Sequence, residues 1–320
     1  MTETYEKNRL RNFPVTLFST VMGVTGLAIA FLRYGAVMQT DMSPAKYLLF
    51  AVSVWFVIVL TTYIAKLIKY PEAVKEEFFH PVKLNFFPTM SISLLLLSIG
   101  YEGISHEASR YLWMLGTVIQ ITFTFIIIDI WFFGDFKITA VNPAWFIPVV
   151  GNILVPVSGV NHAGAELGWF FFSIGIVLWI ALFTTVVYRM IFHEQLLAKF
   201  LPTLFIMIAP PAVGFISYVK LTGSLDPFSR ILYYFALFIT LMLFSMFRRL
   251  KKVPFYVSWW AYTFPLDAMT IATILIYKMT KYPLFHTLAT FLLILTSAVV
   301  TVVFIRTVKE MAGGKVCVPE

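Results

Sequence analysis

The sequence predicts an all-α polytopic membrane protein with ten transmembrane helices, arranged as five helical hairpins around a central pore. Three observations lead to this prediction. The 320 residues are 60% hydrophobic and only 12% charged, whereas soluble domains carry about 25% charged residues. The apolar residues fall into ten stretches of spanning length, and prolines gather in alternate stretches. A net charge of +8 would suggest nucleic acid binding in a soluble protein, but here it fits basic loops at a membrane surface.

The ten spans follow from the rule that a membrane-crossing helix needs about 20 mainly apolar residues. The third and fifth are the shortest. We place the spans at Pro14–Leu32, Tyr47–Ile68, Leu84–Gly100, Tyr111–Phe133, Pro143–Val160, Leu167–Tyr188, Leu201–Leu221, Ser229–Phe247, Phe255–Tyr277 and Leu284–Ile305.

The distribution of Lys and Arg predicts the orientation. An even number of spans puts both termini on one side, and 17 of the 24 basic residues fall on that side. The other 7 are Arg33, Lys46, Arg110, Lys220, Arg230, Lys278 and Lys281. Because cytoplasmic loops carry the excess of basic residues, we expect both termini in the cytoplasm and the protein in the plasma (inner) membrane.

Proline placement separates the odd spans from the even ones. In even spans proline stands at the first turn or is absent, and there its missing N–H is harmless. The odd spans instead carry Pro14, Gly23 and Gly26 (span one), Pro88 (three), Pro148 and Pro156 (five), Pro210 and Pro211 (seven) and Pro265 (nine). Broken helices at membrane depth are tolerated where they are buried in protein or line a watery cavity. We therefore expect kinked odd helices inside, lining a path, and straighter even helices outside.

The chain divides into a cytoplasmic N-terminal tail (1–12), a transmembrane channel domain (13–308) and a cytoplasmic C-terminal tail (309–320). The N-terminal tail is polar and has no cleavable-looking signal. The only cysteine, Cys317, lies in the C-terminal tail, so neither an intramolecular disulfide nor a cysteine metal cluster is expected.

Several stretches of the odd spans resemble one family: the slow-type plant anion channels and bacterial TehA-type tellurite-resistance proteins, with yeast malate transporters and sulfite pumps. The similarity runs from Phe13 to the end of span ten. The stretches are Phe13-Pro14 with Phe18 and Gly23, His80-Pro81-Val82-Lys83-Leu84-Asn85-Phe86-Phe87, Asn142-Pro143 with Gly151-Asn152, Ala209-Pro210-Pro211, and Trp259 to Pro265.

The resemblance implies ten helices forming five hairpins around one pore, a homotrimer with a pore in each subunit, and a phenylalanine plug matching Phe264. The residues expected to line or bend that pore are Ser19, Gly23, Pro88, Pro148, Gly151, Asn152, Pro210, Pro211 and Pro265. Two positions depart from the family pattern. Ser19 stands where glycine is common, and Asp267 stands where plant members carry a hydroxyl residue.

Asp267 is three residues from Phe264, so the two side chains share a helix face. A carboxyl group inside a membrane is expensive and is a functional candidate by default. It is a candidate proton or tuning site, and a satisfied packing role is an equal alternative.

Two functions remain open from the sequence. The first is an anion channel for small monovalent anions, gated by Phe264. The alternative is a proton-coupled carrier or exporter of a dicarboxylate, sulfite or tellurite. The five histidines lie at span ends without ligand spacing, so no metal is expected. No catalytic constellation is visible, so neither an enzyme nor a cofactor is expected. The expected partners are small anions, lipids and two further copies of the chain, with no nucleic acid.

Overall fold

Five segments of the chain pack into a ring, and each consists of a 3-10 helix continued by an α-helix. The computed structural model describes residues 8–250 and 252–318. The predicted tails therefore lie partly outside the described residues, at 1–7 and 319–320. The five inner segments are η1 (Val15–Leu17) with α2 (Phe18–Met38), η2 (Lys83–Phe86) with α5 (Thr89–Tyr101), η4 (Pro143–Phe146) with α7 (Ile147–Ala163), η5 (Ala198–Ile208) with α9 (Ala209–Thr222), and η6 (Val257–Tyr262) with α12 (Thr263–Thr280).

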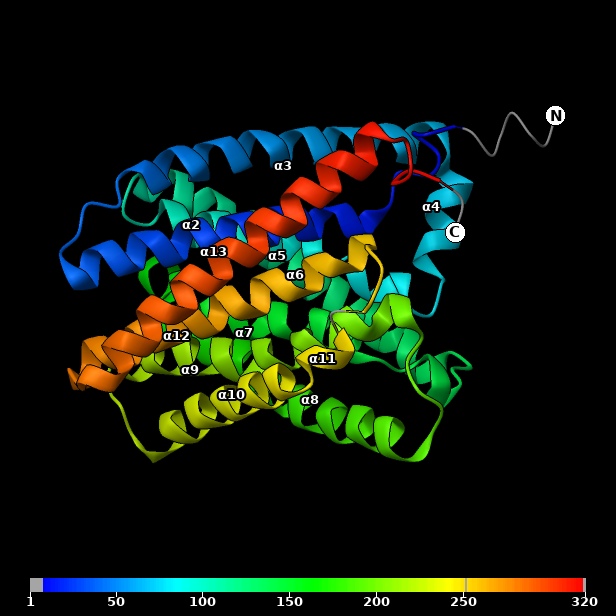
Figure 1. Cartoon of the computed structure of the whole chain (residues 1–320). Coiled ribbons are helices and arrows are strands. Elements are labelled where there is room, and N and C mark those ends of the chain that lie inside the picture. Colours follow the sequence, from blue (N-terminus) through cyan, green and yellow to red (C-terminus); the bar gives the residue numbers. More distant parts are fainter. Residues whose placement is uncertain (1–7, 251, 319–320) are drawn as a thin grey trace.

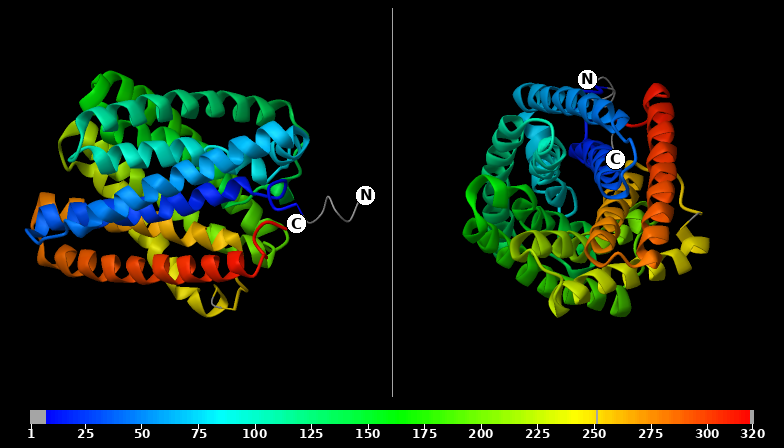
Figure 2. Two further views of the ribbon diagram at one scale, coloured as in Figure 1. Left: turned by 90° about the horizontal axis from the view of Figure 1, so that it is seen from above. Right: turned by 90° about the vertical axis from the view of Figure 1, so that its left-hand side faces the viewer.

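The ring is closed. Around it, α2 packs against α5, α5 against α7, α7 against α9, α9 against α12, and α12 back against α2. The end-on view in Figure 2 shows this arrangement, with the remaining long helices outside. The outer helices are α3 (Pro44–Lys69), α6 (His106–Phe133), α8 (Ala165–Phe192), α10 (Pro227–Ser245) and α13 (Pro283–Ala312). Each follows and packs against an inner α-helix, which gives five antiparallel hairpins (Figure 1).

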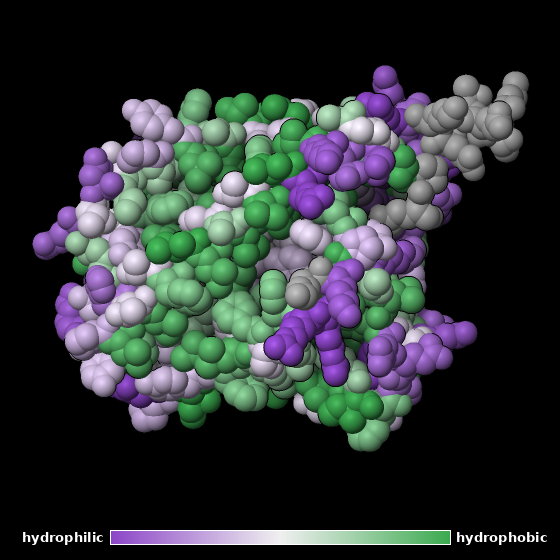
Figure 3. Space-filling view, in the orientation of Figure 1, coloured by the Kyte–Doolittle hydropathy of each residue, from purple (hydrophilic) through white to green (hydrophobic). Residues whose placement is uncertain are grey.

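Burial distinguishes the two sets. In four inner segments, 72% to 94% of the most apolar stretch is buried, against 28% to 39% in the five outer helices. An outer helix thus presents most of its apolar surface outward, as expected for contact with lipid. Figure 3 shows the result on one face: hydrophobic residues cover the middle, and hydrophilic residues gather at both ends. The prediction of odd helices inside and even helices outside is confirmed.

Nine helices in the described part of the chain are long and apolar enough to cross a membrane. They make this an integral membrane protein. Segment η6–α12 is not among the nine, although it completes the ring by packing against α2, α9 and α13. Its sequence includes Thr263, Pro265 and Asp267, which lower its hydropathy. The count of ten crossings stays a prediction.

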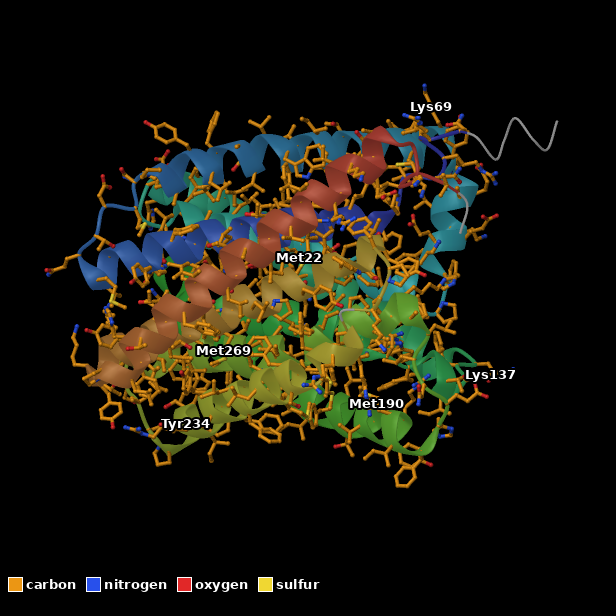
Figure 4. The ribbon with its side chains drawn as sticks, viewed as in Figure 1. Met22, Lys69, Lys137, Met190, Tyr234 and Met269 are labelled. Atoms are coloured by element: carbon orange, nitrogen blue, oxygen red, sulfur yellow. The ribbon has the colours of Figure 1, made fainter. Side chains whose placement is uncertain are left out.

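Three short helices connect the hairpins, namely α4 (Pro71–Phe78), η3 (Ile138–Ala140) and α11 (Phe247–Leu250). The end where η1 begins and α13 finishes is called the terminal end, and α4 lies at this end (Figure 1). Lys69 and Lys137 lie at this end as well (Figure 4). The other end is called the opposite end.

Several helices extend beyond the apolar stretches that predicted them. Helix α6 starts at His106, five residues before the expected Tyr111. The Ser105 side chain caps it by accepting from the N–H of Ala108 at 3.3 Å, and such a cap lets a helix begin in polar sequence. Helix α13 continues to Ala312, so the predicted C-terminal tail begins inside a helix.

Candidate functional site

Two cavities enter the ring of inner segments, one from each end. The terminal vestibule has a volume of about 520 Å³, and its lining includes Pro14, Ser19, Met22 and Pro265. The opposite vestibule has a volume of about 560 Å³, and its lining includes Ile29, Leu154 and Val213. Figure 4 marks Met22 on α2, between the two ends of the bundle. The path through the ring is therefore open from both sides toward the middle.

Phe264 is the one described residue that lines both vestibules. It is the second residue of α12, directly after the six-residue 3-10 helix η6. Its side chain is buried, with 7% of its surface exposed. The aromatic side chain of Phe264 thus stands between the two vestibules and belongs to the wall of each.

Helix α12 reaches this position because two glycines on α2 let it approach closely. A Cβ on Gly23 would stand 2.1 Å from Oγ1 of Thr263, and a Cβ on Gly26 would stand 2.5 Å from Oδ2 of Asp267. No side chain fits at such distances without a shift of α12. Gly23 therefore supports the position of Phe264 from the neighbouring helix, and it does not itself line a vestibule.

Asp267 lies inside the contact between α2 and α12. The residue is fully buried, and neither carboxyl oxygen has a hydrogen-bond partner among the described residues. Its side chain lines neither vestibule. A buried carboxylate without donors is very costly, whereas a neutral carboxyl is tolerated far better. The site therefore suits the protonated form.

Five prolines of the odd spans stand where 3-10 helices change to α-helices, whereas Pro156 lies inside α7 and Pro14 precedes η1. Pro88 is the residue before α5, Pro148 is the second residue of α7, Pro210 and Pro211 are the second and third of α9, and Pro265 is the third of α12. In the first turn of an α-helix a proline removes no helical hydrogen bond. Of these five, only Pro265 lines a vestibule. The backbone changes its helix type at mid-span, where the sequence suggested kinks.

Gly151 and Asn152 contact helix α6 and not the path. The Asn152 amide donates to Oγ1 of Thr124 at 2.9 Å and to the Pro148 carbonyl at 3.0 Å. The Gln120 amide donates to the same carbonyl at 2.8 Å, and a Cβ on Gly151 would stand 2.1 Å from the Gln120 oxygen. These residues tie the inner helix α7 to the outer helix α6.

A buried ion pair at the terminal end was not anticipated from the sequence. Glu77 of α4 accepts hydrogen bonds from Lys66 at 2.7 Å, from the Tyr63 hydroxyl at 2.9 Å and from the N–H of Val15 at 2.9 Å. Lys66 also donates to the Phe13 carbonyl at 2.9 Å. Glu77 borders the terminal vestibule, so this network holds the start of the first inner segment beside the path.

A second ion cluster centres on Glu102 at the opposite end. Its Oε2 accepts from Nη2 of Arg33 at 2.7 Å, and its Oε1 lies 3.3 Å from Nζ of Lys220. The Asn161 amide also donates to Oε1. In the sequence Glu102, Arg33 and Lys220 look like unrelated charges, and only the closed ring of inner segments brings them together with Asn161.

The described residues offer no metal site, since no three His, Cys, Asp or Glu side chains among residues 8–250 and 252–318 are placed to hold an ion. The polar groups of the path are hydroxyls, backbone and a few charges at the mouths. Such a lining can pass an ion.

Comparison with known proteins identifies one family. Residues 12–308 match the family model SLAC1, described as a voltage-dependent anion channel. The S-type anion channel SLAH3 of Arabidopsis thaliana is 29% identical over 317 residues, which cover 93% of this chain and 48% of that protein. This chain therefore spans about half the length of that plant relative.

Relatives of similar length come from prokaryotes. The uncharacterized transporter MJ0762 of Methanocaldococcus jannaschii is 29% identical, covering 84% of this chain and 86% of that protein. A tellurite resistance protein TehA homolog of Haemophilus influenzae is 26% identical, covering 80% and 79%. The region matched by the family model, residues 12–308, coincides with the bundle of hairpins.

Proposed function

Because the chain belongs to the family of voltage-dependent anion channels, we propose that it passes small monovalent anions through the path between its inner segments and that Phe264 closes this path. The family membership supports anions as the transported species. The channel domain of this proposal is residues 13–308, and the gate is the Phe264 ring.

The observation that carries the proposal is the position of Phe264 in the walls of both vestibules. A hydrophobic ring across a narrow passage stops ions by obstruction and by excluding water. The preceding segment η6 is a 3-10 helix, which has weaker hydrogen-bond geometry than an α-helix. The backbone directly before α12, and so before Phe264, can thus change at moderate cost.

The passage beside Phe264 favours anions that lose water easily. The lining of the terminal vestibule includes Phe264, apolar groups such as Met22, Ile147 and Val150, and the hydroxyl residue Ser19. Hydroxyl and backbone groups attract anions weakly and release them readily, which suits conduction better than tight binding. Larger monovalent anions are therefore expected to pass more easily than smaller ones.

The test is the conductance of Phe264→Ala protein in planar bilayers. We expect a strong increase in anion conductance over the parent and an intermediate increase for Phe264→Leu. The stability loss should be below the roughly 3–5 kcal/mol of a phenylalanine removed from a packed core, because this ring borders two cavities. Phe228→Ala on α10, where the ring is 39% exposed, should leave the conductance unchanged. Folded Phe264→Ala protein that conducts no more than the parent would refute the proposal.

A second candidate function rests on Asp267. A fully buried carboxyl with two unpartnered oxygens is suited to carry a proton, so a proton-coupled carrier of a dicarboxylate, sulfite or tellurite is the alternative. In vesicles, anion uptake accompanied by proton movement that Asp267→Asn abolishes would favour the carrier. Flux that follows the electrochemical gradient with no proton movement would favour the channel.

We further propose that the protein is a homotrimer in the plasma (inner) membrane, with the terminal end in the cytoplasm. The basic residues concentrated at the terminal end support the orientation. A cysteine replacing exposed Gly103 should react with an impermeant reagent from outside, and one replacing Lys75 only after permeabilisation. The mass of the detergent-solubilised protein tests the trimer.

A further inference from the structure

The opposite vestibule has an unbalanced charge. Its lining includes Arg33, Lys220, Lys278 and Lys281, and no carboxylate among the described residues lines it. The terminal vestibule differs, because Glu77 and Glu310 lie in its lining together with Lys83, Lys199 and Lys315. Only the opposite vestibule therefore presents cations without acids in its own wall.

Glu102 stands behind this wall and compensates two of the four cations. It follows α5 directly, and it contacts Arg33 at the end of α2 and Lys220 at the end of α9. Its side chain is 13% exposed, whereas those of Arg33 and Lys220 are 46% and 33% exposed. The carboxylate is thus screened from solvent by the cations that it holds, and they face the vestibule.

The other two cations are not compensated in this way. Lys278 has no hydrogen bond or ion pair with any described residue and is exposed. The Lys281 ammonium lies 5.4 Å from the centre of the Tyr277 ring, a contact that keeps its full charge. Among the described residues, the wall of the opposite vestibule therefore carries four positive charges, and Glu102 behind it carries one negative charge.

Glu102 keeps its charge at neutral pH. Burial acts to raise the pKa of its carboxyl, but Lys220 and Arg33 outweigh burial and hold the pKa below its ordinary value. The negative charge behind the wall is therefore permanent under ordinary conditions.

We propose that Glu102 sets how strongly the opposite vestibule attracts small anions, and that Lys278, one of the two uncompensated cations, draws them in. The inference rests on the proposed conduction of anions along this path. A mouth with one sign of charge raises the local concentration of the opposite ion. Conduction also requires that the ion leave again, so attraction must stay weak. Glu102 cancels part of the positive potential, which keeps the attraction weak enough for release. The positive charge that remains still attracts anions into the vestibule.

The proposal predicts opposite effects for two neutralising substitutions, measured in the Phe264→Ala background with chloride in planar bilayers. Near 10 mM salt, where screening is weak, Glu102→Gln should increase the chloride current entering from the opposite end about threefold, as expected for one unit charge several ångströms from the mouth. Lys278→Gln should decrease the same current by a similar factor. Near 1 M salt both differences should disappear, because charges are then screened within about 3 Å.

Two matched controls carry the same charge changes elsewhere at this end of the molecule. Glu107 and Arg230 are exposed and line neither vestibule, so Glu107→Gln and Arg230→Gln should leave the current unchanged. A purely structural role for Glu102 would give a change that is independent of salt and of the direction of current. Lys278→Gln breaks no contact, so it tests the proposal even if Glu102→Gln does not fold.

The outcomes separate this inference from the function on which it rests. If Phe264→Ala protein itself is silent, the proposed channel function fails. If it conducts, but Glu102→Gln and Lys278→Gln match their controls at low salt, the channel stands and the role of Glu102 is refuted.

Discussion

Removing the charge of Glu77 should strongly destabilise the protein, because Lys66 would remain buried without its partner. Lys66 is 3% exposed and Glu77 7% exposed, and their N–O distance is 2.7 Å. Breaking a buried ion pair on one side typically costs about 3–5 kcal/mol. We therefore expect Glu77→Gln to fall in this range. Lys66→Met should cost less, since the carboxylate keeps its hydrogen bonds from Tyr63 and Val15.

The assay is thermal unfolding of detergent-solubilised protein, followed by the loss of monodisperse species. An unfolding entropy of about 2.1 cal/mol/K per residue corresponds to roughly 1.5 °C per kcal/mol in a chain of 320 residues. Glu77→Gln should therefore lower the apparent melting temperature by at least about 4 °C. The double variant should lose less than the sum of the single losses, by about 1–3 kcal/mol, as expected for residues in direct contact.

The controls are the neighbouring exposed residues Glu76 and Lys69. Glu76→Gln and Lys69→Met should each change stability by no more than about 0.5 kcal/mol. A melting temperature for Glu77→Gln that equals that of Glu76→Gln would show that the pair does not hold the first inner segment in place.

Three further predictions concern the inner ring. Asp267→Asn should fold and melt within about 1 kcal/mol of the parent, because a neutral amide replaces a carboxyl that already suits the neutral form; a failure to assemble would make the carboxyl an essential packing group. Gly151→Ala should destabilise the folded protein by about 1–3 kcal/mol, because the added Cβ would stand 2.1 Å from the Gln120 oxygen on α6. Gly103→Ala is the control and should be neutral in the same melting assay, because a Cβ there has nothing within 4 Å. Burial acts to raise the pKa of the Glu102 carboxyl, but Lys220 and Arg33 outweigh burial and lower the pKa. The ion cluster should therefore stabilise the folded protein fully above the ordinary pKa of 4.5 and lose this contribution as the pH falls through the lower folded value. Melting temperatures that stay constant through this acid range would contradict the prediction.

The inner and outer spans could be predicted from the sequence, because proline marks a physical difference between them. Pro88, Pro148 and Pro265 stand inside apolar stretches, which only spans buried in protein can tolerate. The same reasoning did not show what these prolines do. It suggested bends in a pore wall, whereas Pro88 and Pro148 start α-helices after 3-10 turns and line neither vestibule.

The ion clusters could not be predicted, since they depend on which ends of distant helices meet. Glu102 and Lys220 are 118 residues apart in sequence, and nothing in the sequence around either residue specifies the other. The Lys66–Glu77 pair spans 11 residues, but helix α4 holds three acids, Glu72, Glu76 and Glu77. Which of them is buried follows from contact with Phe13 and Val15 at the start of another span. Local patterns predict helices and their environment, while charge pairing requires the closed ring.

The 3-10 helices of the inner segments all lie in the terminal half of the bundle. This placement affects where the inner segments open locally. A 3-10 helix makes i to i+3 hydrogen bonds of poorer geometry than the α-helical ones. The ring of inner segments therefore has a well-bonded half toward the opposite end and a weakly bonded half toward the terminal end. Local opening follows hydrogen-bond strength as well as burial, so amide hydrogens of η5 and η6 should exchange with solvent before those of α9 and α12. The inner segments should therefore be more rigid toward the opposite end than toward the terminal end. Phe264 lies at the boundary between the two parts, just after η6 ends and α12 begins.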